Sequence, residues 1–170
     1  MDFFSSESLD SLNKIYRINL INSITGYKSA NLLGTVSKKG IENLAVFSSV
    51  THLGSNPALL SFFVRPNVVP RNTYKNIKEK KFFTVNHISK EKIDDAHHTS
   101  AKYDEDISEF DKTSLKSEYK NNWEAPFVKD SAVQLGCKYL NEYYLKENGC
   151  SMIIASIELI FIRKGLLQND

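Results

Sequence analysis

Two arginines and a helix-compatible stretch meet in residues 65–76, which read RPNVVPRNTYKN. Pro66 and Pro70 exclude regular structure up to Arg71, and Asn72 is a residue type that commonly caps helices. Unpaired N–H groups at a helix N-terminus and guanidinium groups are both good donors to phosphate. The segment therefore indicates a phosphate site, although a solvated loop before a capped helix would read the same way.

A second candidate is the stretch 43–49 (NLAVFSS), which has one bulky aromatic, Phe47, among small and polar residues. The small side chains of a strand let a flat ligand come close to its backbone N–H and C=O groups. Ala45, Ser48 and Ser49 would allow this approach. An ordinary hairpin strand is the simpler interpretation of the segment taken alone.

The third candidate is a polar cluster between residues 86 and 102. Its members are His87, His97, His98, Thr99, Ser100 and Lys102. Adjacent histidines cannot readily chelate one ion, and no recognised ligand spacing is present, so we predict no metal site. The cluster suits either an anionic, hydrogen-bonding ligand or a solvated helix surface, and the second is the simpler interpretation.

Two further sets of residues are interpreted as structural. Trp123 and Phe127 could cover a cofactor, but we expect them to pack a loop onto the protein body. Cys137 and Cys150 are too few for a disulfide framework, and nothing near them in the sequence indicates a reactive thiol.

Composition predicts one globular domain over residues 1–170, with 41% hydrophobic and 25% charged residues. A net charge of +2 gives no electrostatic reason to expect nucleic acid. Residues 1–10 do not resemble a signal peptide, and the apolar stretch 152–162 is too short to span a membrane as a helix. We therefore expect a cytoplasmic protein with neither a nucleic-acid nor a membrane partner.

Hydrophobic periodicity predicts mostly β-structure. Six strands are expected, at 30–37, 43–51, 58–64, 82–86, 132–143 and 150–161, and three helices, at 13–24, 73–81 and 89–101. Residues 1–11 read as a flexible or partner-docked tail. Residues 103–122 read as an acidic surface loop with at most one helical turn, near 113–116. Without a βαβ rhythm, this pattern favours a mostly antiparallel barrel of the all-β or α+β class.

The order of these segments resembles the flavin reductase-like, FMN-binding split-barrel family over about residues 24–162. The most specific parts are Asn43-x-Ala45-x-Phe47-Ser48, Arg71-x-Thr73-x-x-Asn76 and Phe83-x-Val85-Asn86. Two positions depart from the family pattern, because Val46 and Asn72 stand where many relatives have Pro and Asp. The change at Asn72 removes a negative charge and so favours binding of an anion.

The resemblance implies a six-stranded antiparallel split β-barrel with a few short helices, usually a homodimer with FMN near the subunit interface. It also implies hydride transfer from NADH or NADPH to flavin, and from there to a small-molecule acceptor. The cofactor-binding residues that it implies are Asn43, Ala45, Val46, Phe47, Ser48, Ser49, Arg71, Thr73, Asn76, Thr99 and Lys102.

Within that set, residues 45–49 would line the isoalloxazine ring, and Arg71, Thr73 and Asn76 would surround the phosphate and ribityl chain. Thr99 and Lys102 would lie beside the same pocket. The flavin carries the chemistry, so no catalytic residue is assigned. His98 and Lys102 are candidates for stabilising the reduced ring.

Two other functions stay open from sequence alone. The first is an FMN carrier or sensor that is not rapidly reduced by NADH or NADPH. The second is a small barrel that binds oligonucleotides or another protein, which the balanced charge disfavours.

Overall fold

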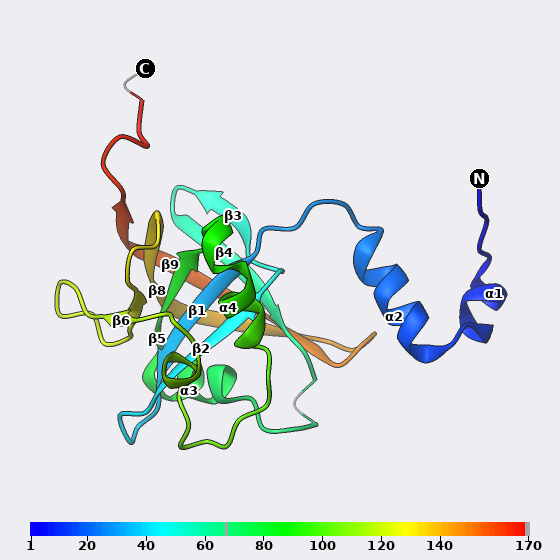
Figure 1. Ribbon diagram of the computed structural model, residues 1–170, viewed down its shortest axis with the longest axis horizontal. Helices are drawn as coiled ribbons and strands as arrows, with labels where there is room; N and C mark the ends of the chain where they lie inside the picture. The colour runs from blue at the N-terminus through cyan, green and yellow to red at the C-terminus, as the bar shows by residue number, and fades with distance from the viewer. Residues whose placement is uncertain (67, 169–170) are drawn as a thin grey trace.

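The computed structural model describes residues 1–66 and 68–168 of the chain, and its centre is a seven-stranded antiparallel sheet (Figure 1). The strand order is β2-β1-β5-β8-β9-β4-β3. The strands are β1 (Asn31–Val36), β2 (Glu42–Phe47), β3 (Thr51–Ser55), β4 (Ala58–Val64), β5 (Phe82–His87), β8 (Val133–Leu145) and β9 (Cys150–Ile162). The mostly β, antiparallel class predicted from the sequence is confirmed.

The count of strands differs from the prediction because the expected strand 43–51 is two strands. β2 ends at Phe47 and β3 begins at Thr51, and the two lie at opposite ends of the strand order. Thr51 is four residues after Phe47, a distance of about 14 Å at most, so these ends of the two strands must lie close together. The sheet therefore curls into a barrel whose seam is crossed by residues 48–50.

Two apolar clusters lie on the two sides of β1 and β2. One fills the barrel and includes Leu33, Phe62 and Phe83, all with no exposed surface. The other includes Leu32 and Leu44 and is covered by short helices. These helices are α4 (Ile93–His98), which follows the 3₁₀ turn η1 (Lys90–Lys92), and α5 (Glu109–Lys112). Both faces of the β1–β2 hairpin are thus buried, which fixes the position of β2.

The acidic region 103–122 is more ordered than the sequence suggests. Its helical turn is α5, and the prediction of a turn at 113–116 is wrong. Phe110 and Leu115 are 5% and 3% exposed and belong to the second cluster. Isolated apolar residues in a charged stretch give no periodic signal, so sequence reasoning missed this contribution to the core.

A two-stranded ribbon of β6 (Ser117–Glu118) and β7 (Phe127–Val128) closes another side of the barrel. Trp123 packs against Gly136, and its indole N–H donates to the Phe83 carbonyl over 3.2 Å. Phe127 is fully buried and lies edge-on to Phe161. The predicted loop-packing role of Trp123 and Phe127 is confirmed.

Asn86 joins three strands from a fully buried position. Its amide N–H group donates to the Leu32 carbonyl on β1 and to the Thr84 hydroxyl on β5, and its oxygen accepts from the Val128 N–H on β7. This residue belongs to the third of the motifs that carry the family resemblance. The structure gives it a purely architectural role.

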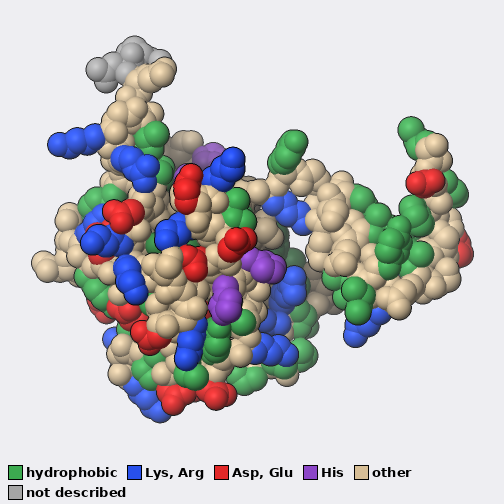
Figure 2. All heavy atoms as spheres, in the orientation of Figure 1, with side chains coloured by type: hydrophobic (Ala, Val, Ile, Leu, Met, Phe, Trp, Pro, Cys, Tyr) green, Lys and Arg blue, Asp and Glu red, His purple; other side chains and the backbone are tan. Residues whose placement is uncertain are grey.

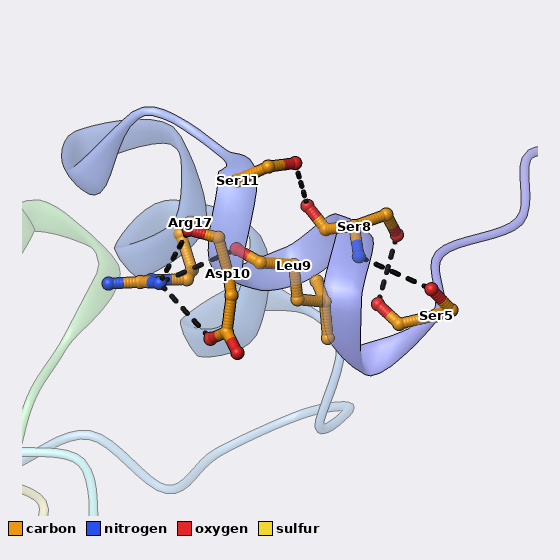
Figure 3. Close-up of polar contacts among 6 residues, drawn as sticks. All are labelled: Ser5, Ser8, Leu9, Asp10, Ser11 and Arg17. Carbon is orange, nitrogen blue, oxygen red and sulfur yellow. Dashed lines mark hydrogen bonds and ion pairs between the residues drawn. The ribbon is translucent and has the colours of Figure 1, made fainter.

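The N-terminal arm, residues 1–30, stands away from the barrel and is the blue segment of Figure 1. The helix predicted at 13–24 is present as α2 (Lys14–Ser23), and the predicted tail contains a further helix, α1 (Ser6–Ser11). Arg17 on α2 donates to the carbonyls of Leu9 and Asp10, and so holds the corner between the two helices (Figure 3). Within the described residues, no helix is long and apolar enough to cross a membrane.

We expect Asn86→Ala to lower the free energy of unfolding by about 1–3 kcal/mol, because the buried Val128 N–H loses its acceptor. Chemical denaturation measures this loss. Asn141→Ala on the exposed part of β8 is the control and should change stability by less than about 0.5 kcal/mol. Equal stabilities of the two variants would contradict the role given to Asn86.

Candidate functional site

The seam of the barrel brings together several of the predicted site residues. Ser49, between β2 and β3, accepts a hydrogen bond from the Phe63 N–H at 3.1 Å through its hydroxyl oxygen. The Ser29 hydroxyl donates to the Val50 carbonyl at 2.7 Å. These contacts tie the crossing segment to β4 on one side and to the root of the arm on the other. The neighbouring Ser48 is exposed and free to face a ligand.

Side chains of β2 alternate between two environments. Leu44 and Val46 face the cluster under α4 and α5. Asn43 and Phe47 lie on the other face, where Phe47 packs edge-on against Phe62 with ring centroids 5.4 Å apart. Ala45 stands between them, is only half-buried and pairs with Leu33 of β1. Its contact with a ligand stays a prediction.

The outer backbone edge of β2 pairs with no strand, because β2 ends the strand order. The Leu44 N–H points out of this edge and donates to Oε2 of Glu109 at 2.8 Å. By the two-residue period of a strand, the Val46 N–H points out of the same edge. Glu109 therefore takes the Leu44 N–H of this edge. The next outward N–H, that of Val46, lies nearer to the seam.

Glu109 is a functional candidate that sequence reasoning did not assign. It is 7% exposed, and burial raises the pKa of its carboxyl above the usual value of 4.5, against the opposing effect of the Leu44 N–H. Its only sequence signal is its place beside Phe110 in the SEF segment. A carboxylate inside an acidic stretch is normally read as solvated surface.

Helix α3 (Asn72–Lys80) is held against the β1–β2 hairpin by two buried pairs of side chains. The Asn43 amide donates to the Thr73 hydroxyl at 3.0 Å, and the Asn76 amide donates to the Thr35 hydroxyl at 3.1 Å. Three predicted ligand residues thus meet in the structure, but their side chains are hydrogen-bonded to protein. They position the helix, and their contact with a ligand stays a prediction.

The N-terminus of α3 lies open to a ligand. The N-cap is Arg71, one residue before the Asn72 that the sequence favoured, and it makes no side-chain capping bond. Among residues 1–66 and 68–168, no side chain accepts a hydrogen bond from the first N–H groups of this helix. Arg71 is half-buried, and its Nε lies 3.4 Å from the Pro66 carbonyl oxygen. Because Thr73 is bonded to Asn43, this end of α3 is fixed relative to β2.

Residues around the end of α4 complete the predicted set. Thr99 is buried, and its hydroxyl donates to the Ala96 carbonyl, so its side chain serves the helix end. His98 is exposed, with Nε2 2.6 Å from the Tyr103 hydroxyl. Lys102 is exposed as well. The structure leaves His98 and Lys102 available to a ligand, and it does not give that role to the Thr99 hydroxyl.

Two hollows of the described surface lie outside the seam. One, lined by Asn43, Asn76 and Lys75 among others, has a volume of about 20 Å³, which suits a single water molecule. The other, of about 560 Å³, lies over β8 and β9 and carries Lys120, Lys129 and Arg163 on its rim. Neither hollow is lined by residues 44–49 or by Arg71. We call the surface formed by residues 45–49 the ledge of the seam.

Comparisons with known proteins identify the family of the chain. The family model described as "Flavin reductase like domain" matches residues 25–168. An uncharacterised protein of Aquifex aeolicus (strain VF5) is 32% identical over 140 residues, which cover 81% of this chain and 70% of that protein.

Solved structures show the same fold. A candidate flavin reductase with a split-barrel domain from Shewanella frigidimarina NCIMB 400 is 39% identical, covers 99% of this chain and 83% of its own, and superposes with a TM-score of 0.95. Nitrilotriacetate monooxygenase component B from Bacillus cereus is 19% identical, with coverages of 99% and 84% and a TM-score of 0.85. Residues 1–30 are about 18% of the chain, so the score of 0.95 requires the arm to superpose as well.

A pH-dependent prediction follows from the burial of Glu109. Above pH 4.5 and below its raised pKa, the folded protein binds more protons here than the unfolded chain, so the free energy of unfolding falls as pH rises. Glu109→Gln keeps a carbonyl acceptor for Leu44 but cannot titrate. We expect the stability of this variant relative to the parent to increase with pH across the interval, by at most about 1.4 kcal/mol per pH unit, and then to level off.

Urea unfolding of the two proteins from about pH 4 to about pH 8 checks this, because all other titrating groups are common to both. A stability difference that is constant with pH would show that Glu109 does not titrate with a raised pKa.

Proposed function

Because the chain belongs to the flavin reductase-like domain family, we propose that it is a cytoplasmic FMN-binding oxidoreductase that works as a homodimer. It takes hydride from NADH or NADPH and passes the electrons to a small-molecule acceptor. The observation that carries the proposal is the fixed juxtaposition of the open edge of β2 with the uncapped N-terminus of α3.

The donors at the seam suit FMN. A phosphate monoester needs N–H donors and positive charge, which the first turn of α3 and the Arg71 guanidinium supply. Arg71 is the first side chain that we assign to the phosphate. The Thr73 backbone N–H is the second donor, and the Thr73 hydroxyl, whose oxygen accepts from Asn43, keeps its own proton to donate.

The ring of the cofactor would lie along residues 45–49. Ala45 allows close approach to the backbone, the Val46 N–H is directed out of the strand edge, and Ser48 is exposed. When bound, flavin supplies a hydride acceptor that no side chain of the protein can replace. The protein then contributes orientation of the ring and exclusion of water from one of its faces.

Lys102 and His98 follow or end α4, in the segment that the family resemblance places beside the pocket, and both are exposed. A cation near the reduced, anionic ring would favour reduction electrostatically. We assign this role to Lys102, since the His98 ring already contacts the Tyr103 hydroxyl.

The direct test is the visible absorption spectrum of the purified protein with and without added FMN, followed by anaerobic mixing with NADH and NADPH. We expect tight FMN uptake and bleaching of the flavin within seconds by one of the nucleotides. FMN binding without bleaching would favour the carrier or sensor function and would contradict the reductase function. Failure to bind FMN would contradict both.

We expect Arg71→Ala to weaken FMN binding by roughly 10- to 100-fold, the usual effect of losing one charge-assisted hydrogen bond. Riboflavin, which lacks the phosphate, should bind both proteins equally. Fluorescence titration with each flavin measures the two affinities. Lys39→Ala is the control, because it removes a positive charge at the exposed turn after β1, where no ligand role is assigned. Equal loss of FMN and riboflavin binding in Arg71→Ala would contradict the phosphate role.

A further inference from the structure

The N-terminal arm exposes large apolar side chains on all sides. On α2 the side chains Ile15, Ile18 and Ile21 are 70%, 47% and 42% exposed, and neither α1 nor α2 buries any residue. With about 100° between successive residues, the apolar side chains of α2 point in every direction around the helix. The polar residues of α2 are also spread around it, so the helix has no wholly polar face to turn to solvent. Figure 2 shows hydrophobic side chains gathered over this arm.

The arm is nevertheless a defined unit. The Ser5 hydroxyl oxygen accepts from the Ser8 N–H and caps α1, and Arg17 fixes the corner between the helices (Figure 3). The superposition on the Shewanella protein includes the arm in the same position off the barrel. The arm does not bury its apolar side chains on its own barrel. We therefore look for a surface of another molecule that would cover them.

The same chain presents a matching surface on the outside of the barrel. Phe63 on β4 lies opposite Met152 on β9, and Met152 lies opposite Tyr143 on β8, so the three side chains form a row on one face of the sheet. Phe63 and Tyr143 are 40% and 54% exposed. The helices α3, α4 and α5 pack on β1 and β2 instead. We call this row, with Leu59 and Ile154 on the same face, the outer β4–β9–β8 face.

We propose that the arm of one copy docks on the outer β4–β9–β8 face of a second copy, and that the exchange is reciprocal. A two-fold dimer uses each surface twice, which covers both apolar surfaces of both chains at once. The exposed large apolar side chains of the arm are Met1, Phe3, Phe4, Ile15, Tyr16, Ile18, Ile21, Ile24 and Tyr27. Those on the side of the arm that meets the partner would form the apolar centre of the interface, and a standard interface covers about 800 Å² per partner.

This docking also connects the dimer to the candidate site. The arm leaves the barrel at Ser29, which bonds to Val50 in the seam, and Phe63 of the outer face bonds to Ser49 in the same segment. The seam ledge of one copy therefore borders both surfaces of the exchange. The inference rests on the proposed function only in taking the flavin to lie at that ledge, and arm docking itself does not require flavin.

The test is photo-cross-linking of the full chain with benzoylphenylalanine in place of Ile18. We expect a product of twice the chain mass, in which the arm is joined to peptides from 58–64, 133–145 or 150–162. The same group in place of Lys39, at the exposed turn after β1, is the control and should give no such product. Products of single-chain mass, joining the arm to its own barrel, would overturn the proposal, and so would attachment to other peptides or no product.

A matched pair of variants tests the energetics. Ile18→Glu should raise the dissociation constant of the dimer at least tenfold, while Asn19→Glu, which places the same charge on the next exposed position, should leave it within twofold. Sedimentation over a range of concentrations measures both. An unchanged dissociation constant in Ile18→Glu would overturn the docking.

FMN absorbance read on the same samples separates the docking proposal from the proposed function. Cross-linked dimers that bind no FMN would refute only the proposed function.

Discussion

The three-residue crossing from β2 to β3 is the constraint on which the rest of the structure depends. It joins β2 and β3, which are the first and last strands of a seven-stranded sheet. Because the connection is so short, the sheet must curl until these two strands approach each other. The curl encloses Phe62 and Phe83 and leaves β2 as an end strand with a free backbone edge. Core, seam and candidate site are thus consequences of one short connection.

A free strand edge is an open template for pairing with another chain, and the protein limits it with neighbouring elements. Glu109 takes up the Leu44 N–H, and α3 is fixed to the hairpin by two buried pairs of side chains. Among the described residues, the Val46 position of this edge pairs with no strand, and Asn43 on the same strand bonds to Thr73 in the first turn of α3. The buried polar residues near the site therefore hold it in shape, and the exposed ones are free to bind.

Sequence reasoning succeeded where a local pattern carried the signal. The apolar run 58–64 is β4, and the β-branched run after the 147–149 turn is β9. It failed where the deciding interaction is long-range. Nothing between Phe47 and Thr51 marks a break, because small polar residues suit a continuous strand, and the break is imposed by closure of the barrel. The burial of Glu109 is likewise set by Leu44, which lies 65 residues away in the chain.

The central claim, that the seam binds FMN, is tested most directly by hydrogen–deuterium exchange of the protein with and without FMN. The account predicts slower exchange in two stretches, 44–49 and 71–75, with the intervening core strand β4 little changed. Protection confined to the hollow rimmed by Lys120, Lys129 and Arg163, or no protection in either stretch at saturating FMN, would contradict it.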